Sequence, residues 1–138
     1  MAAVAKQDAI TNESMGTGRR KSSVASVRLK LGSGKIVING KSIDDFFVNS
    51  QDQKAITETL ELVGQRDSVD IRINVKGGGL SGQSGACRMG LARALVSFNE
   101  DLFQPLRDKG FLTRDSRMKE RKKCGLHGAR KGTQFSKR

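Results

Sequence analysis

Several residue types are scarce in the 138-residue sequence, and each shortage removes a class of protein. The sequence has two cysteines and one histidine, and they form neither a C-x-x-C pattern nor the Cys/His cluster of a zinc site. No apolar run approaches the roughly 18 residues of a membrane span, and no amphipathic segment carries bulky apolar anchors. The sequence therefore predicts no metal, no other cofactor and no membrane partner.

Aromatic residues are also rare, because tryptophan and tyrosine are absent. None of the strands predicted below contains phenylalanine, so the sheet lacks the stacking platform with which many proteins read unpaired bases. The opening stretch, MAAVAKQDAITNESM, has one lysine and no apolar core, and it resembles neither a secretory signal nor a transit peptide. We expect a flexible segment over residues 1–15, in a cytoplasmic protein or one made inside an organelle.

Positive charge, in contrast, is abundant and unevenly placed. The chain holds 26 Lys+Arg against 14 Asp+Glu, a formal charge of +12. Residues 42–113 are nearly balanced, with 8 basic and 10 acidic side chains, whereas residues 16–41 hold 7 basic and no acidic ones. The last 25 residues carry 10 basic and 2 acidic side chains. Two basic segments flanking a balanced middle predict a polyanionic partner, and nucleic acid fits best.

The apolar content of 36% is enough for one modest core. We therefore predict a single globular RNA-binding domain over residues 16–113. Residues 114–138 lack the aliphatic side chains that would offset the entropy of ordering them. They are expected to form an extended basic tail that stays disordered until a partner holds it.

Alternating apolar and polar residues predict three strands. The first starts at Ser22, buries the odd-numbered apolar residues of 25–31 and leaves a basic outer face. KIVIN, residues 35–39, follows the reversal Gly32-Ser33-Gly34, so these two strands are predicted to pair as a hairpin. The third strand is SVDIRINV, residues 68–75.

Helical spacing predicts three helices. One follows a capping-box pattern at Ser50 and Gln53 and ends at Gly64. A second buries a stripe that includes Cys87, and a third, short one begins at Asn99 and closes the core. This order predicts an α+β, two-layer domain in which helices cover one face of a small mixed sheet.

The glycine loop KGGGLSGQSG, residues 76–85, matches the GxGxxG pattern of dinucleotide sites, with acids about 20 residues further on. No strand-like run precedes those acids, however, and Gln83 stands where a phosphate-binding loop would carry lysine. Two other interpretations stay open. The glycines permit a sharp turn and close packing, or backbone amides at the helix start hold an RNA phosphate.

Three longer stretches resemble a known family: GTGRRKSSVASVRLKLGSGKIVING, KGGGLSGQSGACRMGLARAL and GFLTRDSRMKERKKCGLHGARKGTQFSKR. They are similar to the bacterial-type small-subunit ribosomal protein S-nine over residues 16–138. The resemblance implies a domain like the second domain of ribosomal protein S-five, which has a left-handed crossover. It also implies a seat on the ribosomal RNA (rRNA) of the subunit head, beside neighbouring head proteins, and a tail that reaches the P-site tRNA anticodon stem-loop.

Charge and resemblance together give the candidate site. No catalytic residue and no small-molecule substrate are expected. The predicted rRNA-binding residues are Arg19, Arg20, Lys21, Arg28, Lys30, Lys76, Arg114, Arg117, Arg121, Lys122, Lys123, Arg130 and Lys131. Those predicted to contact tRNA are Ser136, Lys137 and Arg138. A basic DNA-architectural protein and a dinucleotide-dependent enzyme built on the glycine loop are the alternatives.

Overall fold

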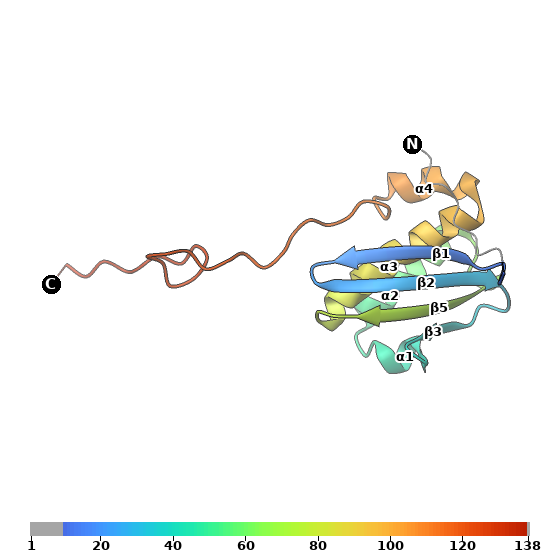
Figure 1. The fold of residues 1–138 in the computed structure, drawn as a ribbon, viewed down its shortest axis with the longest axis horizontal. Helices are drawn as coiled ribbons and strands as arrows, with labels where there is room; N and C mark the ends of the chain where they lie inside the picture. Colours follow the sequence, from blue (N-terminus) through green and yellow to red (C-terminus); the bar gives the residue numbers. More distant parts are fainter. Residues whose placement is uncertain (1–9, 138) are drawn as a thin grey trace.

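Five strands form one mixed sheet in the computed structural model, which describes residues 10–137 (Figure 1). The strands are β1 (Ser14–Arg20), β2 (Ser23–Leu31), β3 (Ile36–Ile38), β4 (Lys41–Ser42) and β5 (Val69–Lys76). Their order in the sheet is β1-β2-β5-β3-β4. The pair β3–β5 is parallel and the other pairs are antiparallel.

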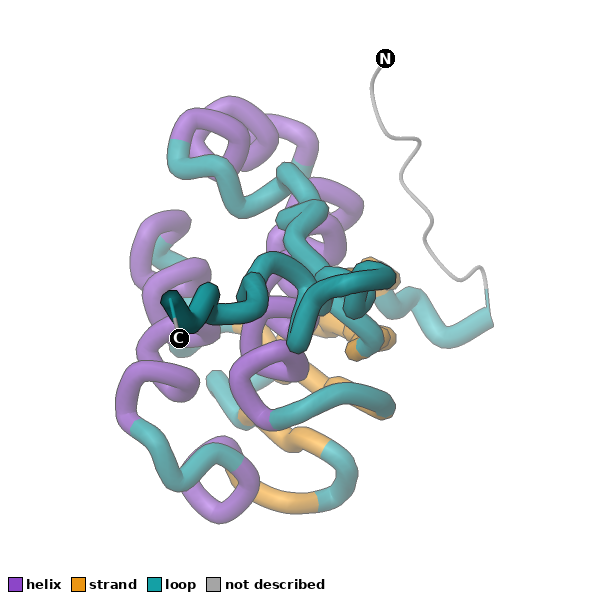
Figure 2. Tube along the Cα trace, turned by 90° about the vertical axis from the view of Figure 1, so that its left-hand side faces the viewer, coloured by secondary structure: helices purple, strands orange, loops and turns teal. Residues whose placement is uncertain are grey.

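The helices cover one face of this sheet, as Figure 2 shows with helices in purple and strands in orange. They are α1 (Ile43–Phe46), α2 (Ser50–Val63), α3 (Leu80–Phe98) and α4 (Phe103–Asp108), with a 3-10 turn, η1 (Glu100–Leu102). The predicted α+β class, with a mixed sheet and helices on one face, is confirmed. Within residues 10–137 no helix covers the opposite face of the sheet, and most side chains on that face are polar.

The predicted hairpin between residues 22–31 and 35–39 is wrong. β2 and β3 both exist, but β5 lies between them and pairs with each. The turn between β2 and β3 is attached to the intervening strand, because Asp70 of β5 accepts hydrogen bonds from the backbone amides of Ser33 (2.8 Å) and Lys35 (3.0 Å). The turn therefore passes the end of β5 and connects two strands that are not adjacent in the sheet. The prediction that Leu31 is buried is also wrong, since this last residue of β2 is 71% exposed.

β1 was not predicted, and it begins inside the segment 1–15 that was expected to be flexible. Residues 1–9 of that segment lie outside the described residues. The inward positions of β1 are Ser14, Gly16 and Gly18, which give no apolar alternation. Their smallness matters instead, because a Cβ atom at Gly18 would overlap the Ala86 carbonyl oxygen of α3. The glycines therefore allow β1 and α3 to touch backbone to backbone.

The helix ends follow local hydrogen-bonding residues, with one shift from the prediction. α2 is capped by Asn49, not Ser50: the Asn49 side chain accepts from the Gln51 amide at 3.1 Å. Gln53 instead donates to the Phe47 carbonyl at 2.6 Å. Gly64 ends α2 with φ = 65°, as predicted. Asn99 begins η1, also as predicted, by accepting from the Asp101 amide.

The core lies between the sheet and α3. Cys87, Leu91 and Leu95 are fully buried along the predicted stripe, and Leu106 of α4 closes one end. Burial raises the pKa of the Cys87 thiol to about 12, because the thiolate would lose its hydration. Cys87 is therefore a core residue, as predicted, while Cys124 is exposed in the tail.

The contact between β1 and α3 generates a stability prediction. Replacing Gly18 with serine should lower the free energy of unfolding by at least ~2 kcal/mol, because the new side chain meets backbone that cannot move aside. The matched control is Gly79→Ser, since a Cβ at Gly79 meets nothing within 4 Å and serine is a good residue at this helix cap. Urea unfolding of both variants measures the difference. Equal stability of the two would contradict the close-packing role of Gly18.

Candidate nucleic-acid interface

The helix-free face of the sheet carries a row of cations. Arg28 of β2 and Arg72 of β5 lie directly opposite each other in the register, a like-charge pair that would be unfavourable alone. Glu13 relieves the repulsion, because its carboxylate lies 3.4 Å from Arg28 and 3.7 Å from Arg72. The Glu13 side chain is only 15% exposed, so it is held between the two arginines.

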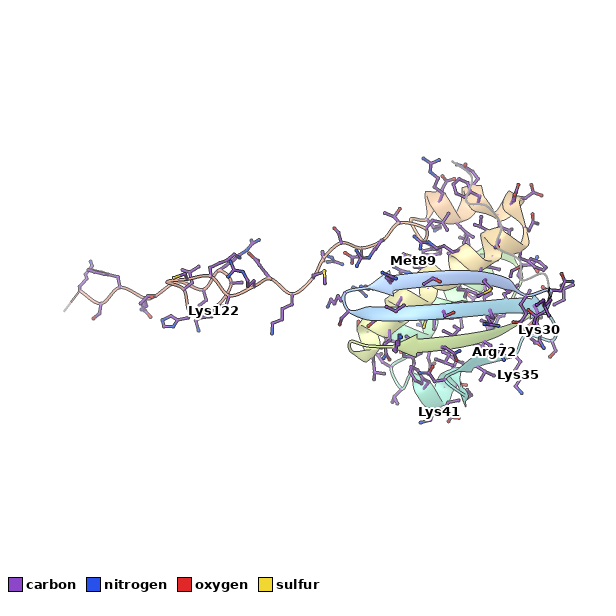
Figure 3. All side chains as sticks on the ribbon, in the orientation of Figure 1. Lys30, Lys35, Lys41, Arg72, Met89 and Lys122 are labelled. Atoms are coloured by element: carbon purple, nitrogen blue, oxygen red, sulfur yellow. The ribbon has the colours of Figure 1, made fainter. Side chains whose placement is uncertain are left out.

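Lys30, Lys35 and Arg72 cluster at one end of this face (Figure 3). With Arg28 they surround a shallow cleft, and the other residues lining it are Glu13, Val37, Asp70 and Ile71. The backbone amides of Lys35 and Ser33 hold the pKa of Asp70 below its ordinary value, so this carboxyl is committed to the turn. This end of the face has four cations and two carboxylates, and both carboxylates already have partners within the protein. It is therefore suitable for binding a phosphate group.

At the opposite end of the sheet the β1–β2 turn meets the glycine loop. Ser23 donates its hydroxyl to the Gly77 carbonyl at 2.9 Å, and Arg20 donates to the Ser81 carbonyl at 3.3 Å. In the register, Arg19 and Lys76 lie on either side of Val24 on the open face. The structure thus brings the predicted residues 19–21 and Lys76 together, although 54 residues separate Ser23 from Gly77.

The geometry of the glycine loop favours the packing interpretation. Gly77 has φ = 78°, and a Cβ there would lie 2.6 Å from the Ser22 carbonyl oxygen. Glu100 and Asp101, the acids that a dinucleotide site would need at a strand end, lie instead in η1 after α3. Among residues 10–137, α3 is followed by η1, α4 and the tail rather than by another strand.

The tail begins beside the same β1–β2 turn. Asp115 bridges the two parts: its carboxylate lies 2.8 Å from Arg117 and 3.7 Å from Arg20. The hydrogen bonds from Arg117, with the charge of Arg20, hold the pKa of Asp115 well below its ordinary range. Just before it, Phe111 is buried and lies under the guanidinium of Arg88, 5.3 Å from the ring centroid.

Residues 114–137 contain no helix or strand, and they extend away from the domain (Figure 1). Most of the predicted contact residues of the tail are exposed: Arg114, Arg117, Arg121, Lys122, Arg130, Lys131, Ser136 and Lys137. Lys123 is half-buried, and both it and Arg130 pair with Glu120. Arg138, predicted to contact tRNA, lies outside the described residues.

Several cations near these surfaces were not among the predicted site residues. Arg72 alternates with the buried residues of β5 and could have been assigned to the open face from periodicity alone. Lys35 reaches that face only through the unpredicted sheet order. Arg88 and Arg93 belong to α3, and Arg93 donates to the Thr17 carbonyl at 2.9 Å, so it ties α3 to β1.

The described part of the chain lacks two features that are typical of other functional classes. Residues 10–137 contain no group of three or more His, Cys, Asp or Glu side chains able to hold a metal ion. They also contain no helix that is long and apolar enough to cross a membrane.

Two comparisons with known proteins point to the same family. The model of the family described as "Ribosomal protein S9/S16" matches residues 18–138. A relative from Rhodopirellula baltica, described as small ribosomal subunit protein uS9, is 65% identical over 133 residues. The match covers 96% of this chain and 97% of the relative. The similarity therefore includes both the domain and the tail.

The Asp115 bridge predicts how the tail leaves the domain. In Asp115→Asn, the distances between probes on Cys124 and on an introduced Lys54→Cys should spread more widely, because Arg20 loses its anionic partner. Double electron–electron resonance on the full chain measures this, and buried Cys87 stays unlabelled. Because the pKa of Asp115 is lowered, the wild-type distribution should persist as pH falls to 5 and broaden only below the ordinary value of 3.8.

The control for this measurement is Asp44→Asn, which changes the charge equally at an exposed site on α1. An equal spread in the two variants would show that the Asp115 bridge does not direct the tail.

Proposed function

The chain belongs to the ribosomal protein S9/S16 family, and from this membership we propose its finer role. It is a structural constituent of the small ribosomal subunit whose domain binds rRNA in the head and whose tail reaches the P-site tRNA. The observation that carries this proposal is the uneven charge: residues 42–113 hold 8 basic and 10 acidic side chains, whereas the 25-residue tail holds 10 basic and 2 acidic ones. It acts in the cytoplasm, on the ribosome, and is not an enzyme.

The domain would bind the RNA backbone through both ends of the open sheet face. Arg19, Lys21 and Lys76 at one end are exposed and make no ion pair among the described residues. Lys30 and Arg72 at the other end are also exposed. Cations in such positions displace the counterions condensed on phosphates, which favours binding to the backbone rather than to base edges. Neighbouring head proteins would contact the remaining surface.

The tail would act where a folded domain does not fit. An extended chain can enter a crowded RNA interior, and its lysine and arginine side chains supply charge-assisted hydrogen bonds to phosphates. Lys137 is exposed at the far end of the described tail, and Ser136 beside it is also exposed. Phe135 is 85% exposed, and we propose that it packs against RNA or protein once the tail is bound.

Sedimentation tests the proposal against the DNA-architectural alternative. The protein should travel with small subunits through a gradient and be released as salt is raised, because counterion release makes the affinity fall steeply with salt concentration. Mass spectrometry of the gradient fractions measures this release. Recovery with chromosomal DNA alone would refute the ribosomal role. Saturable binding of NAD or ATP, lost in Gly79→Val, would instead support an enzyme built on the glycine loop.

The end of the tail gives a second prediction. Deleting residues 136–138 should leave subunit assembly intact and weaken P-site tRNA binding at least about tenfold, since one hydrogen bond to a charged group contributes about 1.5–3 kcal/mol. Filter binding of tRNA to reconstituted subunits measures the loss.

The control is the pair Lys41→Ala and Lys54→Ala, which removes two exposed cations from the domain. Unchanged tRNA affinity in the deletion variant, or an equal loss in this control, would rule out a specific role for the terminal residues.

A further inference from the structure

The tail contains one closed loop, residues 120–131, which we call the tail loop (Figure 1). Its two ends are joined through Glu120, whose carboxylate lies 2.8 Å from Lys123 and 2.9 Å from Arg130. Three backbone hydrogen bonds lie inside it: His127 to Lys131 (2.9 Å), Lys123 to Gly128 (3.3 Å) and Leu126 to Lys123 (3.3 Å). Gly125, with φ = 78°, supplies the left-handed turn that the loop needs.

Glu120 is an acidic residue in a strongly basic segment. It is one of two acids among the last 25 residues, and a carboxylate in an RNA-binding tail repels the phosphates that the tail must approach. Each of its oxygens is engaged by a different cation, one three residues and the other ten residues along the chain. Glu120 thus links Lys123 and Arg130, which are seven positions apart in the tail.

The cations of the loop fall into two groups. Lys123 and Arg130 are committed to Glu120. Arg121, Lys122 and Lys131 are exposed and have no ion pair within residues 10–137, and Figure 3 labels Lys122 on the loop. The Glu120–Arg130 pair brings the backbone at Lys131, the next residue, back towards the residues that follow Glu120, which are Arg121 and Lys122.

We propose that Glu120 is a positioning residue that closes the tail loop before RNA binding, so that Arg121, Lys122 and Lys131 form one phosphate-binding surface. Lys123 and Arg130 hold the loop rather than contact phosphates. This inference rests on the proposed rRNA binding of the tail and divides the residues assigned to it into two roles. The partner is the rRNA backbone.

Removing the Glu120 carboxylate would change RNA affinity in opposite directions, depending on which of two roles Glu120 has. Two exposed ion pairs on one carboxylate change the equilibrium constant for loop closure by about fivefold. If only the closed loop binds and the loop is mostly open without these pairs, the apparent affinity falls by nearly the same factor when they are lost. If Glu120 were merely an unfavourable charge, its removal would strengthen binding, because one more net positive charge faces the RNA.

The test compares two full-length variants that gain the same charge, Glu120→Gln and the control Glu58→Gln on an exposed position of α2. Each competes with isotope-labelled wild-type protein for incorporation into small subunits that lack this protein, and mass spectrometry measures the ratio. Glu58→Gln should match the wild type, whereas Glu120→Gln should be about fivefold disfavoured. Binding to polyuridylate, a non-specific RNA, should be equal or tighter for Glu120→Gln.

The outcomes separate this inference from the proposed function. Incorporation of Glu120→Gln as efficient as that of Glu58→Gln would overturn the role of the tail loop and leave the ribosomal role intact. Failure of the wild type to incorporate would overturn both.

A double-mutant cycle tests the division of the cations. Lys122→Ala should reduce incorporation equally in the wild type and in the Glu120→Gln background, because Lys122 contacts RNA independently. Lys123→Ala should have a smaller effect in the Glu120→Gln background, where its partner is already lost. Equal effects of Lys123→Ala in both backgrounds would show that it does not act through Glu120.

Discussion

The contact between β1 and α3 is the constraint on which the rest of the structure depends. β1 has glycine at two inward positions, Gly16 and Gly18, and α3 presents Gly90 to it. Backbone therefore lies against backbone, and Arg93 adds a hydrogen bond to the Thr17 carbonyl. Because β1 is fixed in this way, the turn that follows it lies beside the start of α3, where Arg20 reaches both Ser81 and Asp115. The basic turn, the glycine loop and the base of the tail meet for this reason.

A second organising feature is the use of acids as internal partners of the basic segments. Residues 16–41 contain no acid, and two of their seven cations pair with acids from other segments: Glu13 bridges Arg28 to Arg72, and Asp115 pairs with Arg20. Each of these carboxylates joins segments far apart in the sequence. Exposed ion pairs contribute little stability individually. Their effect here is to set the direction of side chains and chain segments while most cations stay available to a polyanion.

The sequence predicts the helices and strands that depend on neighbouring residues. It does not predict features that are determined by contacts between distant residues. β2, β5, α2 and α3 follow from the periodicity of their own residues. β1 gives no such signal, because its buried positions are serine and glycine. The order of the sheet involves contacts between distant residues, such as the hydrogen bond from Ser33 to Asp70 across 37 residues. The candidate site behaves in the same way: exposed cations are evident from the sequence, but their pairing with Glu13, Asp115 and Glu120 needs the fold.

The two acids divide the tail into distinct parts, although residues 114–137 contain no helix or strand. Asp115 joins its first residues to the domain, and Glu120 closes residues 120–131 into a loop. Beyond Lys131 the tail has no further acid. An anchored base fixes where the tail starts, and a closed loop shortens the span that must be ordered on binding, which lowers the entropic cost. Residues 132–137, beyond the loop, form no helix or strand and are the described part of the tail that lies furthest from the domain (Figure 1).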